Sequence, residues 1–363
     1  MKFAYITSHP IIQNDGVSKK ILEQIETCAK FGVETKLFVN ANFRKFKLGT
    51  DFANRNFVKY YDAKNKLSRI FNKALIEDVK AFNPDLVYYR YDFYTLNYEI
   101  LSNKYKTVIE IQTKDIDEFF LTHIRNKKYG LYGYFSYLYF FLGRNRFLNK
   151  ASAFVGVTNE ILDYYSSFCK PAICIPNGIN LSKYNTIKKA YIDEKVRFFF
   201  IGTEGMPWHG IDIIESLAQK LPQYEFHIVG INKKSELNNL KYYGPMNYEV
   251  YIKILEKCHI CIGTLALYRN NMKEACTLKV REYLAHGFPV ILGYKDTAFL
   301  NNTPDFILEL EFCNDEVTND HIQKIKEFTE SQKNRIVKKE ELSAIDIYSL
   351  EEKKIKFLKN LLK

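Results

Sequence analysis

The chain has 363 residues, of which 47% are hydrophobic and 26% are charged, a composition that excludes an intrinsically disordered protein. A single hydrophobic core stops growing at about 250–300 residues, so this length predicts two domains, each with its own core. The net charge of +11 predicts an anionic partner, which could be a phosphorylated ligand, an acidic membrane surface or a nucleic acid.

The N-terminal residues and the cysteines both predict an intracellular protein. Ser8, His9 and Pro10 interrupt the first apolar run, which is too short for a signal peptide or a membrane span. The seven cysteines are irregularly spaced, and their odd number does not indicate a disulfide framework. Cys258 and Cys261 form a Cys-x-x-Cys pair within an apolar run, but no second pair with zinc-like spacing follows, so we expect no metal site there.

In the first half of the chain, apolar runs alternate with amphipathic stretches. Between the first two runs, Ile21, Ile25 and Cys28 recur at helical spacing, and Gly32 supplies a signal for the end of a helix. This alternation predicts a parallel sheet with crossover helices. The predicted strands are residues 2–7, 33–40, 84–90, 106–112 and 152–158.

The segment 123–150 is the densest basic and aromatic part of the sequence. Its composition suits a bilayer interface, where aromatic rings lie at headgroup level and basic side chains contact anionic lipids. A pair of helices packed into the domain, with a solvated basic rim, is an equal alternative. Nucleic acid is not expected as a partner, because no zinc-finger, RNP-like or helix-turn-helix signature accompanies the charge. The basic residues are Arg125, Lys127, Lys128, Arg144, Arg146 and Lys150.

The alternating pattern begins again after residue 190, with a turn-rich hinge at 170–185 before it and a charged helix at 350–363 after it. We therefore predict an α/β protein with two Rossmann-like, doubly wound domains that face each other across a cleft. The expected domains are 1–175 and 176–340, with 341–363 forming a helix that packs back on the first domain. The predicted strands of the second half are 196–202, 224–230, 260–267 and 289–293, with helices over 210–222, over 248–258 and from about 277.

Ligands of open parallel sheets bind beyond the carboxyl ends of the strands, where amides and helix N-termini point outward. Three junctions of this kind stand out. Residues 8–20 contain an Asn-Asp-Gly turn before a helix, and residues 200–212 contain three glycines around the only tryptophan. The third junction, 274–291, has two glutamates eight positions apart, followed by a Gly-Phe-Pro turn.

The segments FIGTEGMPWHGIDIIE, IPNGINLSKY and EACTLKVREYLAHGFPVI resemble retaining GT-B glycosyltransferases of the large bacterial family 4 type. The similarity spans nearly the whole chain, and its most specific element is the Glu-x7-Glu motif from Glu274 to Glu282. The resemblance implies transfer of a sugar from a UDP- or GDP-sugar to a glycan or lipid-linked acceptor. It also implies retention of configuration, independence of metal ions and the absence of a cofactor.

The resemblance implies roles for the residues of this motif. Glu274 would contact hydroxyls of the donor sugar, and Glu282 would hold the ribose. Breaking the donor bond leaves a diphosphate with additional negative charge, so stabilising that charge is the main task. A helix that begins at Thr277 or Leu278 would direct its N-terminus at the diphosphate, and Lys279 would add a full positive charge.

The sequence departs from the family pattern at three positions. Thr203 stands where the family usually has an arginine, His209 where it has a lysine, and Gln112 where it tends to have a histidine. Two fixed positive charges are therefore missing, and we expect His209 to share in neutralising the leaving diphosphate. The remaining expected site residues are Gly16 and Gly202 on the donor side, with Asn14 and Asp15 beside Gln112 on the acceptor side.

Two other interpretations remain open. A GT-B nucleotide-sugar epimerase would need carboxylates and a histidine around the donor sugar but no acceptor site. A non-catalytic scaffold at a membrane surface would keep only the fold. For the glycosyltransferase, the basic and aromatic first domain suits a lipid-linked acceptor, so we expect a role in bacterial surface polysaccharide or glycoconjugate synthesis. Its expected location is the cytoplasm or the inner face of the cytoplasmic membrane.

Overall fold

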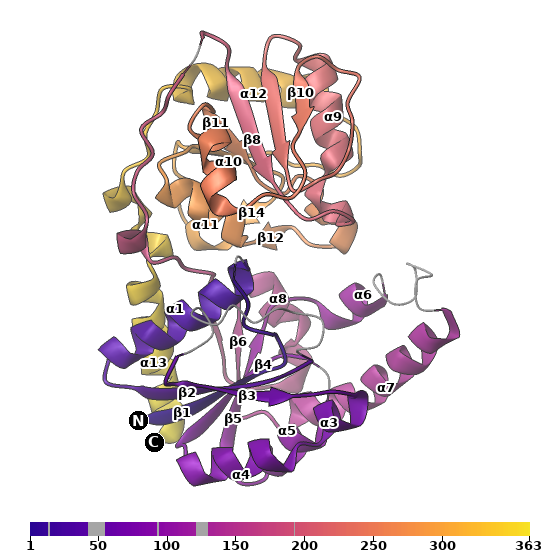
Figure 1. Cartoon of the computed structure of the whole chain (residues 1–363), viewed down its shortest axis with the longest axis vertical. Helices are drawn as coiled ribbons and strands as arrows, with labels where there is room; N and C mark the ends of the chain where they lie inside the picture. Colours follow the sequence, from indigo (N-terminus) through magenta and orange to yellow (C-terminus); the bar gives the residue numbers. More distant parts are fainter. Residues whose placement is uncertain (14, 43–54, 93, 121–129, 192) are drawn as a thin grey trace. The chain divides into compact units, whose positions relative to one another are not determined.

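The chain folds into two compact units, Met1–Pro176 together with Ile347–Lys363, and Asn177–Asp346. The computed structural model describes residues 1–13, 15–42, 55–92, 94–120, 130–191 and 193–363 (Figure 1). The terminal helix α13 (Ile347–Leu362) belongs to the first unit although it follows the second unit in the sequence. Each unit is built on a parallel sheet covered by helices, so the fold is α/β with two Rossmann-like sheets.

The described part of the first unit contains a seven-stranded parallel sheet in the order β3-β2-β1-β4-β5-β6-β7. The strand order reverses between β1 and β4, which is the topological switch point of this sheet. The strands are β1 (Lys2–Thr7), β2 (Glu34–Ala41), β3 (Val58–Asp62), β4 (Leu86–Arg90), β5 (Lys106–Ile111), β6 (Ala153–Gly156) and β7 (Ala172–Cys174).

Helix α1 (Gly16–Lys30) shows how the local sequence specifies an element. Asp15 is its N-cap and accepts a hydrogen bond from the Ser18 amide at 2.7 Å, which satisfies one of the free amides of the first turn. Ile21 and Ile25 are buried against the sheet, as their spacing predicts. The helix ends just before Gly32, whose φ of +69° is costly for other residues.

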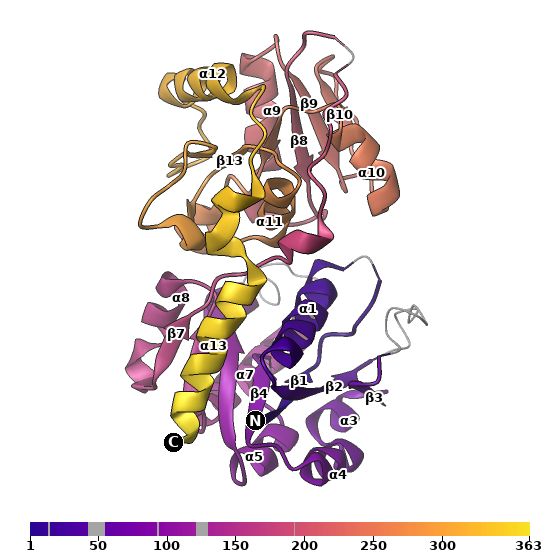
Figure 2. The same cartoon turned by 90° about the vertical axis from the view of Figure 1, so that its left-hand side faces the viewer.

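Helices cover both faces of the first sheet. α1 and α13 lie side by side (Figure 2), and Leu358 of α13 shares a core cluster with Tyr5 of β1. α7 covers part of the other face, where Phe147 stacks on Tyr98 of α5 with ring centroids 3.9 Å apart. The remaining helices of this unit are α3 (Lys66–Ile70), α4 (Lys73–Phe82), α5 (Leu96–Ser102), α6 (Asp115–Phe119), α7 (Gly130–Asn149) and α8 (Asn159–Tyr164).

A buried ionic contact ties α1 to the first sheet. Lys20 of α1 donates to Glu110 of β5 at 2.7 Å, and the Tyr5 hydroxyl donates to the other carboxylate oxygen at 2.7 Å. Burial alone would raise the pKa of Glu110, but the charges of Lys20 and Arg90 lower it to about 2. Glu110 therefore stays ionised and fixes the register of α1 against β1 and β5.

The second unit repeats the same architecture. Its described residues form a six-stranded parallel sheet in the order β10-β9-β8-β11-β13-β15, with the order reversed between β8 and β11, and a separate two-stranded sheet β12-β14. The strands are β8 (Arg197–Ile201), β9 (Glu225–Val229), β10 (Leu240–Tyr242), β11 (Ile260–Ile262), β12 (Glu274–Ala275), β13 (Val290–Leu292), β14 (Lys295–Asp296) and β15 (Ile307–Glu309). The helices are α9 (Ile211–Lys220), α10 (Tyr248–Leu255), α11 (Leu278–Ala285) and α12 (Asn319–Gln332).

The strand predicted over 260–267 is too long. β11 ends at Ile262, and the chain then leaves the sheet, with Gly263 packed so closely that a Cβ atom would lie 2.6 Å from the Leu292 side chain. Beyond it, the Leu265 amide donates to the His209 carbonyl oxygen at 3.3 Å instead of pairing with a strand. The apolar run continues because these residues are buried under another loop, which apolar periodicity cannot distinguish from a strand.

Candidate functional site

The switch point of the second sheet carries a short turn that connects two strand ends. The turn η5 (Pro207–His209) follows β8 and precedes α9. Besides the contact with His209, the Ala266 amide donates to the Trp208 carbonyl oxygen at 3.1 Å, so the loop after β11 holds this turn by two backbone hydrogen bonds. These residues lie at the carboxyl ends of β8 and β11, where open α/β sheets bind their ligands.

Two glycines let the backbone come close around this turn. A Cβ atom on Gly202 would lie 2.8 Å from His209 Nδ1, and one on Gly210 would lie 3.1 Å from the Ala266 amide nitrogen. Gly210 also has a φ of +71°, a conformation that other residues rarely adopt. Gly202 therefore makes room for the buried ring of His209, and Gly210 makes room for the loop at Ala266.

His209 is buried beside an aromatic ring. Its imidazole packs edge-on against Phe200 with centroids 5.5 Å apart, and its Nδ1 atom has no hydrogen-bond partner among the described residues. Burial, and to a smaller extent the charge of Lys279, lowers the pKa of His209 to about 3, while a hydrogen bond with the Thr203 backbone acts in the opposite direction. His209 is therefore neutral at neutral pH.

Lys279 approaches the same aromatic ring from the first turn of α11. Its Nζ atom lies 4.2 Å from the centroid of Phe200, is buried, and has no hydrogen-bond partner within the described residues. Burial lowers the pKa of this lysine to about 7. A buried ammonium without an acceptor is costly, so this group and His209 together form a place where an anion would be stabilised.

The N-terminus of α11 adds to this positive environment. Thr277 is its N-cap, but the Thr277 side chain makes no capping hydrogen bond to the first turn. Its hydroxyl lies instead 2.9 Å from the hydroxyl of Tyr294. The Thr277 side chain therefore leaves the first amides of the helix, beginning with Leu278, uncapped, and the helix dipole favours an anion there.

Buried polar contacts fix the position of α11. Arg281 donates to both carboxylate oxygens of Asp296 at 2.6 and 2.7 Å, and neither side chain is exposed to solvent. Arg281 Nε also donates to the carbonyl oxygen of Asn177 at 2.6 Å. The Tyr283 hydroxyl accepts from the Ile201 amide at 2.9 Å, which connects the helix to the end of β8. None of these side chains was expected at the site from the sequence.

The two glutamates of the motif lie on either side of the start of α11. Glu274 is buried in β12, which pairs with β14 and places Glu274 opposite Lys295. Glu282 lies one turn beyond Lys279 along the helix, and the hydroxyl of Tyr251, on α10, donates to one of its carboxylate oxygens. Tyr251 thus orients Glu282, a contact that no sequence motif indicated.

In the first unit, the expected acceptor-side residues Asp15 and Gln112 form hydrogen bonds with residues close to them in the sequence. Asp15 caps α1 and also lies 2.7 Å from His9 Nε2, while Gly16 is the exposed first residue of that helix. Gln112 follows β5 and donates to the Glu110 carbonyl oxygen at 2.7 Å. Asn14 lies outside the described residues.

A polar cluster that was not predicted from the sequence lies at the switch point of the first sheet. Arg69 of α3 lies 3.2 Å from the hydroxyl of Ser8, and both side chains contact Asp92. Ser8 follows β1 and Asp92 lies just after β4, so the predicted strands place both residues at carboxyl ends, but only the structure shows that the two strands are neighbours. The contact of Arg69 with this cluster could not be predicted, because α3 was not predicted.

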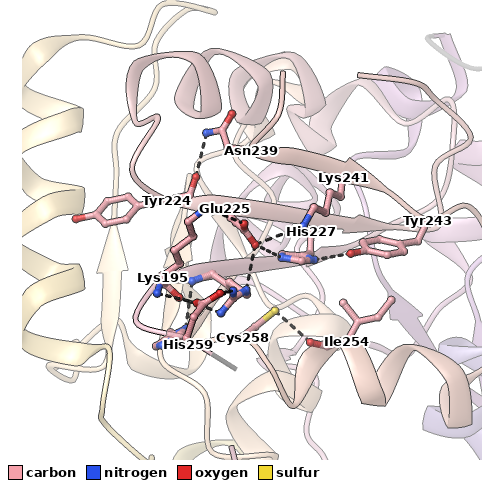
Figure 3. A network of polar contacts seen from close by, with 12 residues as sticks. Lys195, Tyr224, Glu225, His227, Asn239, Lys241, Tyr243, Ile254, Cys258 and His259 are labelled. Carbon is pink, nitrogen blue, oxygen red and sulfur yellow. Dashed lines mark hydrogen bonds and ion pairs between the residues drawn. The ribbon is translucent and has the colours of Figure 1, made fainter. Parts of the chain in front are cut away.

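A second network in the second unit lies away from this site. Figure 3 shows His227 between Glu225 and Tyr243, with its Nε2 atom 3.5 Å from the Glu225 carboxylate. Glu225 is the first residue of β9 and pairs with Arg197, the first residue of β8, at 3.0 Å. The network therefore joins the amino ends of these strands, opposite the edge where η5 and α11 meet, and we interpret it as structural.

Within the described ranges of the chain, no three His, Cys, Asp or Glu side chains are grouped closely enough to hold a metal ion. Among the helices described, none combines the length and the apolar character needed to cross a bilayer.

No protein-family model matches the sequence, and no curated protein matches it. Solved structures match over the whole chain. Sucrose-phosphate synthase from Thermosynechococcus elongatus has 12% identity and a TM-score of 0.70, with 99% of this chain and 98% of that chain covered. Anabaena HepE in complex with UDP has 14% identity and a TM-score of 0.62, with 99% and 100% covered. UDP-GlcNAc 2-epimerase from Neisseria meningitidis, bound to UDP-GlcNAc, has 15% identity and a TM-score of 0.54, with 99% and 100% covered.

These likenesses establish the fold class. Two parallel Rossmann-like sheets, matched from end to end with glycosyltransferase structures, define a GT-B fold, as predicted from the sequence. At these low identities, the assignment to the family 4 type, and the roles that it implies for individual residues, remain proposals.

Proposed function

We propose that the protein is a glycosyltransferase that takes a sugar from a nucleotide-diphosphate sugar, and that the second unit binds this donor. One observation carries the proposal: the buried Lys279 ammonium, which has no hydrogen-bond partner in the described structure, lies at the N-terminus of α11 near His209. Two neighbouring basic groups and a helix N-terminus suit a diphosphate. The fold shared with HepE, solved in complex with UDP, supports the same ligand class.

The arrangement supports a distinct role for each side chain. Lys279, His209 and the amides at Thr277 and Leu278 would contact the diphosphate. Glu282 has one carboxylate oxygen oriented by Tyr251, and its second oxygen can accept from the ribose hydroxyls. Glu274 would accept from hydroxyls of the donor sugar. Gly202 and Thr203 would let the donor approach the backbone after β8, and Gly16 would do so after β1.

The proposed reaction breaks the bond between the anomeric carbon of the sugar and the terminal phosphate oxygen. A new bond joins that carbon to the acceptor oxygen, with retention of configuration, and the proton of the acceptor hydroxyl is released to water. The leaving diphosphate gains one negative charge, and Lys279, His209 and the α11 dipole would stabilise it. In this proposal the chain supplies the whole of that stabilisation and no metal ion takes part.

The acceptor would be a glycan or a lipid-linked glycan of bacterial surface polysaccharide or glycoconjugate synthesis. Asp15, Gln112 and the cluster of Ser8, Arg69 and Asp92 lie at the carboxyl edge of the first sheet, where hydroxyl groups could be bound. We place the reaction in the cytoplasm or on the inner face of the cytoplasmic membrane.

A ligand panel tests donor binding. Melting temperatures would be measured with UDP, GDP, UDP-sugars and GDP-sugars, for the wild type, Lys279→Ala and the matched surface variant Lys253→Ala. A ligand at 100 times its Kd stabilises the folded state by about 2.7 kcal/mol. We expect this shift in the wild type and in Lys253→Ala, and its loss in folded Lys279→Ala. Absence of any shift in the wild type, or an equal shift in all three proteins, would refute the proposed site.

The reaction products separate the proposed activity from the alternatives. The epimerase has a structural basis in the likeness to UDP-GlcNAc 2-epimerase, and it would convert one nucleotide sugar into another. A transferase without its acceptor is expected to release free sugar and nucleoside diphosphate slowly. A non-catalytic scaffold would bind the nucleotide and release neither product.

A further inference from the structure

Helix α7 is apolar on the face that packs into the first unit and also on the face that does not. Phe140, Phe147 and Leu148 are buried, with at most 4% of each residue exposed. On the outer side, Leu131 is 80% exposed and Phe135 is 71% exposed. One apolar face is enough to pack a helix on a domain, so the fold does not explain the second one.

The exposed side chains follow one another at helical spacing, so they lie on one side of the helix. No charged residue occurs between Gly130 and Gly143, and Figure 1 shows α7 at the periphery of the first unit. Contiguous exposed apolar surface of this kind marks a site of interaction. We call this set the α7 stripe; it consists of Leu131, Tyr134, Phe135, Leu138, Phe141 and Leu142.

The charges around the α7 stripe have a single sign in the sequence. No Asp or Glu occurs between Glu118 and Glu160, whereas six basic residues do. Three of them, Arg125, Lys127 and Lys128, precede the helix and lie outside the described residues.

The structure modifies the expectation for the other three basic residues. Arg144 is buried and donates to Asp115 at 2.6 Å, whereas Arg146 and Lys150 both pair with Glu99. The side chain of Arg146 nevertheless remains 63% exposed at the end of the helix. The stripe itself is therefore apolar and uncharged, and among the described residues the exposed basic side chain that follows it in the sequence is that of Arg146.

We propose that the α7 stripe inserts between the headgroups of an anionic membrane while the exposed Arg146, beyond its C-terminal end, contacts acidic lipids. Aromatic and aliphatic side chains with flanking Lys and Arg suit this interface. A second copy of the chain fits less well, because stripe-to-stripe packing would bring two sets of like charges together. The inference goes beyond the proposed donor site and does not depend on it.

Co-sedimentation of the full chain with vesicles tests this proposal. The wild type should bind vesicles of equimolar phosphatidylglycerol and phosphatidylcholine, bind vesicles of phosphatidylcholine alone weakly, and lose affinity as salt is added. Replacing Leu131, Phe135 and Leu142 together by Ser should lower the affinity about tenfold or more. These side chains are at least 70% exposed, so the triple variant should keep its melting temperature. Val250→Ser, a change at a 50% exposed residue of α10, is the matched control and should bind like the wild type.

Three results would overturn the proposal. The first is equal binding of the wild type to both kinds of vesicle, and the second is unchanged binding by the triple variant. The third is a dimer without lipid that the triple variant converts to a monomer, which would identify the stripe as an interface between copies. None of these measurements uses donor turnover, so they stand apart from the test of the proposed activity.

Discussion

The ammonium of Lys279 lies 4.2 Å from the centroid of the Phe200 ring and has no hydrogen-bond acceptor in the described part of the chain. A cation over an aromatic face is stabilised by the ring, but this contact replaces only part of the lost hydration. The side chain is thus held in position while its charge remains uncompensated. We interpret this as a binding site prepared for an anion.

A site prepared in this way should lower the stability of the free protein. Because burial holds the pKa of Lys279 near 7, below that of an exposed lysine, the protonated form opposes folding. This loss of folding stability is complete below pH 7 and disappears as the pH rises to the pKa of an exposed lysine. Lys279→Met should therefore raise the free energy of unfolding at neutral pH, on the order of 1 kcal/mol or more. Denaturant titration at pH 7 would test this, and lower stability of the variant would contradict it.

Glu282 and Tyr251 should act together on the nucleotide. Removing a charge-assisted hydrogen bond costs about 1.5–3 kcal/mol, so Glu282→Ala should weaken binding of the donor and of free nucleoside diphosphate alike. Tyr251→Phe should produce a smaller loss, because Glu282 keeps its charge but loses its orientation. Calorimetric titration of each variant measures the effect. If folded Glu282→Ala binds nucleotide like the wild type, the ribose assignment is wrong.

Glu274 should behave differently, since its proposed contact is with the sugar. Glu274→Ala is expected to bind nucleoside diphosphate almost as well as the wild type but to turn over the donor much more slowly. Comparing Kd for the diphosphate with kcat separates the two effects. A parallel fall in both quantities would show that Glu274 supports the structure of β12 instead.

The buried pair of Arg281 and Asp296 should be a major determinant of stability in the second unit. Arg281→Met leaves a buried carboxylate without its partner, which costs about 3–5 kcal/mol. The double variant with Asp296→Leu removes that charge as well and should recover much of the loss. Denaturant unfolding of the wild type and both variants tests this, and equal stability of all three would contradict it.

Long buried strands were predictable from the sequence, whereas short edge strands were not. β1, β5 and β8 have continuous buried runs, which apolar patterning detects. β7, β10 and β15 have three residues each and include exposed or half-buried positions, so no period can be recognised in them. The run over 260–267 was misassigned for the opposite reason, because a buried loop is as apolar as a strand.

The candidate site was predictable only where a local motif marks it. The start of α11 and the position of Lys279 on its first turn were expected, and the structure has them there. Their partners come from distant parts of the chain: Phe200 from β8, Tyr251 from α10 and Asp296 from β14. Such contacts depend on the strand order of the sheet, which the sequence pattern does not specify.

The proton balance of nucleotide binding tests the central claim most directly. A diphosphate beside Lys279 and His209 should raise the pKa values of both groups from about 7 and about 3 in the free protein. Binding of UDP or GDP should therefore take up protons and weaken as the pH rises above 7. Calorimetric titration at pH 8, in buffers of different ionisation enthalpy, measures this uptake. We expect clear uptake in the wild type and a smaller one in Lys279→Arg, whose charge does not titrate. Nucleotide binding without proton uptake in the wild type would contradict the assignment of the diphosphate to Lys279 and His209.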